Sequence, residues 1–132
     1  MIDKSNELFT VMAETVRAFD GTCKVIGESV DTPSSFPTVT IEEISNVPKY
    51  LDSAQSPKYA FVTYRIQVFC NDAEGKRARA RELFKVIDGK MYELGFVHKT
   101  YTTTPTIYNS KIYSITATFE GVIDRNGTVY RN

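Results

Sequence analysis

The chain has 132 residues, and its sixteen Lys and Arg are balanced by sixteen Asp and Glu, so its formal net charge is zero. No overall field draws such a protein toward nucleic acid or anionic lipid, and any attraction of that kind must come from a local patch. The length is typical of one domain, here residues 1–132, with one ordinary core. No run is apolar over the length of a membrane span.

The N-terminal sequence MIDKSNELFT carries charges where a signal peptide needs an unbroken apolar stretch, so we expect the protein to stay in the cytoplasm where it is made. An amphipathic helix is predicted over residues 3–19, and Asp20 and Gly21 end it. Its expected buried stripe consists of Leu8, Phe9, Met12, Val16 and Phe19.

Three strands should follow this helix, at residues 22–30, 38–45 and 58–70. The clearest is the third, because its residues alternate between two faces. One face carries Ala60, Val62, Tyr64, Ile66, Val68 and Cys70, and the other carries Phe61, Thr63, Arg65, Gln67 and Phe69. Two prolines and two serines predict a loop at 31–37. Residues 46–57, NVPKYLDSAQSP, also predict a long loop, which would place Tyr50 and Leu51 in a polar setting.

A second helix is predicted from residue 71 or 72, where Asn71 and Glu74 resemble a capping box, to a glycine C-cap at Gly95. Its apolar stripe is Ala80, Leu83, Phe84, Ile87, Met91 and Leu94. Downstream we expect a short strand at 96–101 and a loop at 102–110.

The chain should close with a long strand at 111–124, a hairpin turn around Asn126 and Gly127, and a short final strand. The long strand places apolar residues on one side, namely Tyr113, Ile115, Ala117, Phe119 and Ile123. The predicted order is therefore helix, three strands, helix, three strands. Hairpin connections favour an α+β fold, a mainly antiparallel sheet with both helices packed against it.

The second helix gathers three of its positive charges on one flank. A helical wheel places Arg79 and Lys90 on one side of the apolar stripe, and Arg77, Arg81 and Lys85 on the other at i, i+4 and i+8. We call these last three residues the basic ridge. Like charges at this spacing cost about 0.2–0.5 kcal/mol per pair. Two readings remain open: an ordinary solvated face, or a surface that meets acidic groups of a neighbouring subunit or partner.

Phosphate and nucleic-acid binding are weaker alternatives for this segment. The stretch NDAEGK has one glycine where a Walker loop needs GxxxxGK[ST], so it lacks the nest of backbone amides. Aromatic residues are not interleaved with the basic ones, so platforms for base stacking are missing as well.

No catalytic, metal-binding or cofactor-binding pattern stands out, and we expect the protein not to be an enzyme. The lone His98 has no metal partner at a suitable spacing, and no GxSxG motif is present. Glu42 and Glu43 are neighbours on a predicted strand, so their side chains should point to opposite faces. Cys23 and Cys70 form no CxxC motif, and reduced, half-buried thiols are expected.

Four stretches carry a resemblance to a known family. They are FPTVTIEEISN, the strand YRIQVFCN, the helix GKRARARELFKVIDGKMYELGF and the C-terminal YSITATFEGVIDRNGTVYR. In order and spacing they resemble the small tail terminator, or tail completion, proteins of long-tailed phages. The resemblance covers about residue 35 to the end, and the first helix agrees in length and amphipathicity. None of these stretches is a chemical motif.

The resemblance implies an α+β protein that assembles as a six-membered ring on the head-proximal end of the tail tube. Such a ring stops tube polymerisation and offers the surface that joins the tail to the head, so the implied partners are further copies of the chain, the tail tube protein and a head completion or connector protein. DNA passes through the lumen without specific binding, and no cofactor or membrane is involved. The implied location is the virion, after assembly in the host cytoplasm.

Two rival functions stay open on the sequence: another head-tail connector or neck protein of the same particle, or a cytosolic ligand-binding α+β module. A head-to-tail ring needs two different complementary surfaces. The basic ridge is one candidate interface, and Tyr50 and Leu51 in the predicted long loop are another.

Overall fold

The computed structural model describes residues 2–27, 37–51, 57–70, 76–106 and 109–130. They form two helices and six strands: α1 (Ser5–Phe19), β1 (Lys24–Ile26), β2 (Thr38–Leu51), β3 (Pro57–Cys70), α2 (Lys76–Glu93), β4 (Val97–Thr106), β5 (Asn109–Asp124) and β6 (Val129–Tyr130). The predicted order of helices and strands is confirmed.

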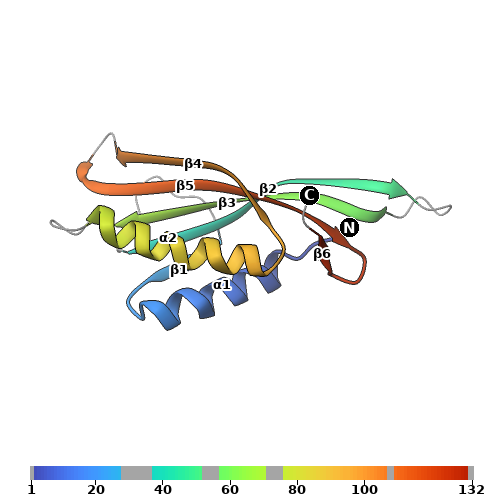
Figure 1. The fold of residues 1–132 in the computed structure, drawn as a ribbon, viewed down its shortest axis with the longest axis horizontal. Helices are drawn as coiled ribbons and strands as arrows, with labels where there is room; N and C mark the ends of the chain where they lie inside the picture. The colour runs from blue at the N-terminus through green and yellow to red at the C-terminus, as the bar shows by residue number, and fades with distance from the viewer. Residues whose placement is uncertain (1, 28–36, 52–56, 71–75, 107–108, 131–132) are drawn as a thin grey trace.

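The strands form a single sheet in the order β1-β2-β3-β5-β4, and β6 pairs with β5 (Figure 1). Only the short β1–β2 pair is parallel, and the other four pairs are antiparallel. The predicted α+β class with a mainly antiparallel sheet is therefore correct. Register shifts interrupt the ladders between Glu43 and Ser45 in β2 and between His98 and Thr100 in β4, where the strands bulge.

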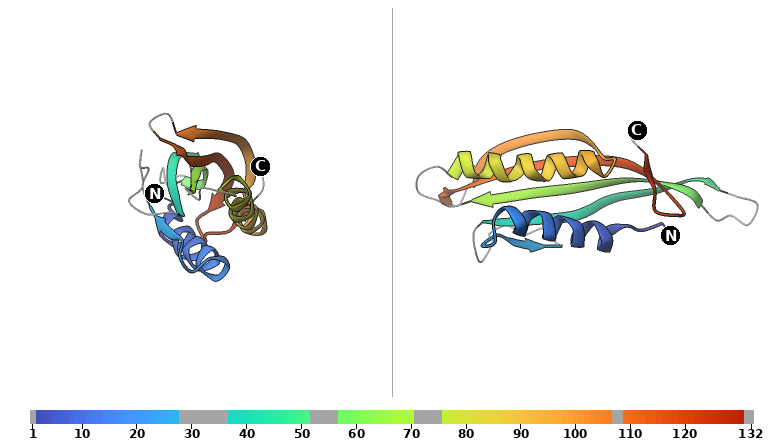
Figure 2. Two further views of the ribbon diagram at one scale, coloured as in Figure 1. Left: turned by 90° about the vertical axis from the view of Figure 1, so that its left-hand side faces the viewer. Right: turned by 60° about the horizontal axis from the view of Figure 1, so that its bottom comes forward.

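Both helices cover the same face of the sheet (Figure 2). They contact each other, while α1 lies against β1 and β2, and α2 lies against β3, β4 and β5. The predicted alternation of β3 is confirmed, because its even-numbered residues 60–70 are all at most 1% exposed. The predicted apolar sides of β5 and α2 are buried too, with Leu94 at the end of α2 only partly so. We call the opposite, helix-free side of the sheet the outer face.

One residue of the predicted α1 stripe is placed differently. Phe19 is 49% exposed, whereas Ala13, which the prediction left out, is buried. Phe19 is the last residue of α1, and the chain turns at Asp20 toward β1. The Asp20 carboxylate, and not the Phe19 ring, meets α2 at this point, through an ion pair with Arg79.

Both long loops predicted after residue 45 are wrong over most of their length. Residues 46–51 continue β2 and Pro57 begins β3, while 102–106 belong to β4 and 109–110 to β5. Pro48 and Pro105 suggested loops, but both lie on strands at the edge of the sheet, where the missing N–H can face away from the ladder. Residues 52–56 and 107–108, the loop at 31–36 and the capping box at Asn71 and Glu74 lie outside the described residues.

Two glycines allow the end of α2 to pack tightly against the sheet. Gly95 has a φ of +101° and ends the helix as predicted, with its N–H donating to the Tyr92 carbonyl and the Phe96 N–H donating to the Met91 carbonyl. The Phe96 ring then lies over Gly121 of β5. A Cβ on Gly121 would come within 2.8 Å of the Phe96 ring and 3.1 Å of Val129.

Replacing Gly121 with Ala should therefore destabilise the protein by about 1–3 kcal/mol, because Phe96 is buried on all other sides and cannot move away freely. The matched control is Gly89→Ala, since Gly89 is exposed in α2 and a Cβ there meets nothing within 4 Å. That variant should gain about 0.5–1 kcal/mol from helix propensity. Urea unfolding measures both, and equal free energies for Gly121→Ala and the parent protein would contradict the packing described here.

Candidate protein-interaction surfaces

The positive charges of α2 differ in whether they have an acidic neighbour. On one flank, the Arg79 guanidinium lies 2.5 Å from the Asp20 carboxylate, and Lys90 lies 3.6 Å from Glu93. On the other flank Arg81 and Lys85 are exposed, and within the described residues neither pairs with an acid. Arg77 lies in the first turn of α2, but its side chain is outside the described part of the chain. Both interpretations of the basic ridge, a solvated face or a surface that meets acidic groups of another protein, therefore stay open.

Tyr50 and Leu51 are at the end of β2 and not in a loop, and their side chains lie outside the described residues. This end of β2 and the first turn of α2 are at opposite ends of the molecule (Figure 1). The structure therefore does not bring the two predicted interface segments together. If both segments bind partners, they bind at two separate places.

Sequence reasoning missed an apolar cluster on the outer face, where β2, β3 and β5 extend beyond the helices (Figure 1). Val47 pairs with Phe61, Phe61 with Val122, and Val122 with Tyr130, so four apolar residues are aligned across four strands. Tyr59 lies beside them, with its ring centroid 6.4 Å from that of Tyr130. We call these five residues the aromatic patch.

The patch is accessible to a partner. Val47 is 43% exposed and Tyr130 is 49% exposed. Tyr59, Phe61, Val122 and Tyr130 line a hollow of about 300 Å³. An exposed apolar cluster with a polar surround is a common mark of a binding surface. The only sequence signal for it was the odd-numbered face of β3, and the cluster becomes visible only with the register of all four strands.

The middle of the outer face is polar and electrically balanced. One row across the sheet runs from Glu42 through Arg65 and Thr118 to Thr100. Arg65 lies 3.1 Å from Glu42, and the Thr100 and Thr118 hydroxyls are 2.7 Å apart. In the next row, the Gln67 amide donates to Thr116 over 3.4 Å. Arg65, the one cation of these two rows, therefore has an acidic partner on the same surface.

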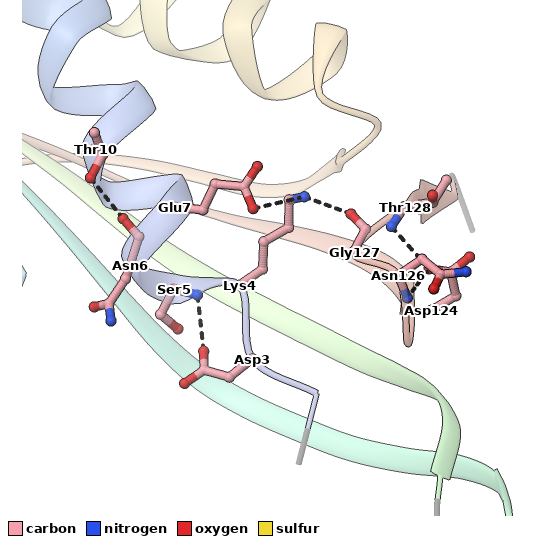
Figure 3. A network of polar contacts seen from close by, with 10 residues as sticks. All are labelled: Asp3, Lys4, Ser5, Asn6, Glu7, Thr10, Asp124, Asn126, Gly127 and Thr128. Carbon is pink, nitrogen blue, oxygen red and sulfur yellow. Dashed lines mark hydrogen bonds and ion pairs between the residues drawn. The ribbon is translucent and has the colours of Figure 1, made fainter.

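The N-terminal segment is bonded to the β5–β6 turn (Figure 3) and also to β2. The Lys4 ammonium donates to the Gly127 carbonyl over 2.6 Å and lies 3.3 Å from Glu7. The Asn46 amide of β2 donates to the Ile2 carbonyl over 2.8 Å. Lys4 thus connects the start of α1 to the turn between β5 and β6, 123 residues away.

The β5–β6 turn is ordered by one carboxylate, as Figure 3 shows. Asp124 accepts hydrogen bonds from the backbone N–H groups of Asn126 and Thr128, and from the Tyr130 hydroxyl. The Thr128 N–H is the main cause of a lowered Asp124 pKa, and the hydrogen bond to Asp124 raises the pKa of Tyr130. The predicted hairpin at Asn126 and Gly127 is confirmed, and it holds Tyr130 in the aromatic patch.

The residues weighed for catalysis are placed apart. His98 is exposed on β4, with Nδ1 3.5 Å from Asp88 and Nε2 2.7 Å from the Thr100 carbonyl oxygen. Glu42 pairs with Arg65 on the outer face, whereas Glu43 is bound by Asn46. Within the described residues, no three His, Cys, Asp or Glu side chains are grouped so as to hold a metal ion.

Cys23 and Cys70 are in no disulfide, as expected, but they are almost completely buried and not half-buried. Burial raises the pKa of Cys23 to about 12, so this thiol stays protonated and unreactive at neutral pH. Among the described residues, no helix is long and apolar enough to cross a membrane.

No family model matches this sequence, and no curated protein matches it either. Among solved structures, the chain is similar to one described as "Structure of bacteriophage SPP1 gp17 protein". The identity is 18%, the TM-score is 0.38, and the match covers 86% of this chain and 89% of that chain. A bacteriophage protein is thus among its weakly similar solved structures, and at this level the similarity does not assign a function.

Replacing Lys4 with Met should cost about 1 kcal/mol of unfolding free energy, because the partly buried bond to the Gly127 carbonyl is lost while most of the apolar stem remains. Hydrogen exchange should also accelerate at the β5–β6 turn. The control is Glu7→Gln, which removes only the exposed ion pair and should cost less than about 0.5 kcal/mol. Unchanged exchange at the turn in Lys4→Met would show that Asp124 alone orders it.

Proposed function

We propose that this chain is a structural protein of a phage particle, and that it forms a ring on the head-proximal end of the tail tube. The ring ends tube polymerisation and provides the surface that joins tail to head. In this proposal the protein is not an enzyme, and its partners are its own copies, the tail tube protein and a head completion or connector protein. The sequence resemblance supplies the family, and the sheet supplies the physical support that follows.

The observation that carries the proposal is that the strands at the two open edges of the sheet run in opposite directions. In the described residues, β1 covers β2 only over 38–40, so residues 41–51 of β2 form one open edge, and β4 forms the other. The strands alternate in direction across β2, β3, β5 and β4. β4 of one copy therefore runs opposite to β2 of the next, and an antiparallel sheet can continue from copy to copy. Such head-to-tail contacts form a closed ring when the rotation between copies closes.

The outer face suits the inside of that ring. Helices cover the other face, so they would lie on the outside of a closed sheet (Figure 2). The threonine hydroxyls and the Arg65–Glu42 pair would then line the lumen. DNA-binding proteins gain affinity by neutralising phosphates with Lys and Arg. The middle rows of this face carry one cation, Arg65, which already pairs with Glu42. These rows gain little in this way, which is consistent with DNA passing through without being held.

Several features of the edges limit pairing before assembly. Both carry a proline, Pro48 or Pro105, and both carry a bulge. Prolines and bulges are common features by which proteins prevent an exposed edge strand from pairing with another chain. Weak edges are useful to a subunit that must assemble only on its target, because the tube end adds contacts of its own and raises the effective concentration of neighbouring subunits.

The basic ridge would lie on the outside of the ring, since α2 packs on the face away from the lumen. There Arg81 and Lys85 can meet acidic groups of an adjacent subunit or of a head protein. The end of β2, with Tyr50 and Leu51, would lie at one rim of the ring and the start of α2 at the other. We assign these two rims to the tail tube and to the head side, without ordering them.

The ring is tested by cross-linking the two edges. A variant with Ser45→Cys on β2 and Thr102→Cys on β4 should give a ladder of covalent oligomers that ends at six, when treated with bis-maleimides of increasing length in the presence of tail tubes. The single variants are the controls, because head-to-tail contacts never bring two copies of the same edge together. Buried Cys23 and Cys70 should not react. Equal dimer yields from the single and double variants would contradict the head-to-tail arrangement.

The function is tested with the purified parent protein, alone and mixed with tail tubes, by native mass spectrometry and negative-stain electron microscopy. We expect six-fold rings or caps on one end of each tube, and tubes of limited length when the protein is present during polymerisation. Binding to the portal side but not to tubes would indicate another neck protein. A persistent monomer or dimer that ignores tubes would refute the proposal and favour the ligand-binding alternative.

A further inference from the structure

We propose that a hollow between α1 and β2 is a receptor for a positively charged side chain, and that Lys85 of the adjacent copy in the ring occupies it. The hollow is a feature of the single chain, whereas its occupant rests on the proposed ring. The inference gives the basic ridge a partner and places their contact on the helix side of the sheet.

The hollow opens beside the open edge of β2 and has a volume of about 270 Å³. Its walls combine apolar and polar side chains, namely Ser5, Asn6 and Phe9 of α1 with Gly27, Ile41, Glu42, Glu43 and Tyr64. Glu42 is paired with Arg65, so the charges of these two residues offset each other. Glu43 is the carboxylate of the wall that remains for a ligand.

Two carboxylates meet at this hollow without a cation. Glu43 accepts a bond from the Asn46 amide over 3.1 Å, and within the described residues neither Glu43 nor Asp3 forms an ion pair. Burial is the main cause of a raised Glu43 pKa, and the Asp3 charge raises it further. The next segment of the sequence, residues 28–36, contains no Lys or Arg. Among the described residues, the negative charge of the hollow is therefore unbalanced.

The Tyr64 hydroxyl is a second, independent sign of a ligand. Tyr64 is 1% exposed, and within the described residues its hydroxyl has no hydrogen-bond partner. Burial raises the Tyr64 pKa to about 12, the Ser5 side chain lowers it, and the charges of Glu43 and Asp3 raise it. Buried polar groups are rarely left without a partner. An ammonium group carries three donors, enough for both the Tyr64 oxygen and the Glu43 carboxylate.

The basic ridge lies above the opposite edge of the sheet. On the ridge flank of α2, Asp88 lies 3.5 Å from His98 of β4. The other flank faces α1, through the ion pair of Arg79 with Asp20. Lys85 is therefore on the side of α2 that a neighbour at the β4 edge would approach.

The hollow and Lys85 also lie at similar heights along the strands. Glu43 pairs with Tyr64, Tyr64 with Phe119, and Phe119 with His98, so Glu43 and His98 are the two ends of one row across the sheet. Lys85 is less than one helical turn from the residue of α2 that contacts His98. Copies in a closed ring are related by rotation. With strands along the ring axis, Lys85 of one copy comes beside the hollow of the next.

Lys85 is able to make this contact. It is exposed, and within the described residues it forms no ion pair with Glu82 or Asp88 of its own helix. Its apolar stem can lie against the Phe9 ring in the wall while its ammonium meets Glu43. Arg81, the next residue of the ridge, is one helical turn farther from this row.

The receptor can be tested on the parent protein without a ring. The probe is N-acetyl-lysine N-methylamide, and N-acetyl-norleucine N-methylamide is its uncharged counterpart. At constant ionic strength, the lysine probe should shift the amide resonances of Gly27, Glu43 and Tyr64 saturably, and the norleucine probe should leave them unchanged. Magnesium chloride should also leave them unchanged, which separates an ammonium site from a metal site.

Glu43→Gln should weaken binding of the lysine probe about tenfold, because a hydrogen bond between charged groups is lost. Tyr64→Phe should weaken binding too. It should unfold at a urea concentration no lower than that of the parent protein, because it removes a hydroxyl that has no partner. Glu7→Gln is the matched control, since Glu7 is exposed on α1 and pairs with Lys4. It should bind the probe like the parent protein.

The occupant is tested by charge reversal in the cross-linking variant with cysteines at both edges. Lys85→Glu and Glu43→Lys should each lose the ladder that ends at six, because each places like charges at every contact. An equal mixture of the two should recover it, since alternating copies place opposite charges at every contact. Lys90→Glu reverses a charge on the other flank of α2 and should give the ladder of the parent variant.

The possible failures can be told apart. An absent shift with the lysine probe, or a lower urea midpoint for Tyr64→Phe, would overturn the receptor and indicate a hydroxyl already satisfied, for example by an ordered water. Stronger probe binding after acetylation of the chain's α-amino group would make that amine the occupant. Unchanged ladders from both reversed variants would exclude Lys85 and leave the ring standing. A parent variant that gives no ladder would refute the ring itself.

Discussion

The two-residue period of β3 is the constraint on which the rest of this fold depends. β3 pairs along its length with both β2 and β5. Paired residues lie on the same face of the sheet, so the alternation of buried and outer residues in β3 also holds in both neighbours. The even-numbered residues of β3 from Ala60 to Cys70 face the helices and are almost completely buried. A slip of one residue in either ladder would move Ile66 or Val68 to the outer face and bury Arg65. The polar rows and the aromatic patch are both set by this choice of register, which also provides the apolar surface against which α2 packs.

The parts that could be predicted from sequence are those whose signal is local. The even-numbered face of β3 and the stripe from Ala80 to Met91 are periodic within a few residues, and both are correct. The errors have physical reasons too. Pro48 and Pro105 indicate loops when the sequence is read alone, yet an edge strand accepts a proline because one side of its backbone has no ladder. Phe19 fits the helical period, but the helix ends there and Asp20 takes the contact with α2.

The candidate sites were less predictable, because they combine residues from distant parts of the chain. A helical wheel separates Arg79 from Arg81. Only the fold shows that Arg79 pairs with Asp20, whereas Arg81 has no acidic partner within the described residues. The aromatic patch needs Val47, Phe61, Val122 and Tyr130 to come into line. The bond from Lys4 to Gly127 joins opposite ends of the sequence. A local sequence pattern does not report which distant residues lie side by side. The helices and strands are therefore predicted in the right order, while the aromatic patch is not predicted.

The bulges in β2 and β4 have a consequence for copy number. Hydrogen-bonding edges specify which strand lies next to which, but they would pair equally well in an assembly of any size. What limits the size is the angle through which each copy turns the sheet. A bulge bends its strand and increases the local twist, and the two bulges, at Glu43 and Ser45 and at His98 and Thr100, lie on the two outermost long strands. If copies of this chain join edge to edge as proposed, the curvature of these two strands would set the number that closes the assembly, and the chemistry of their contacts would not.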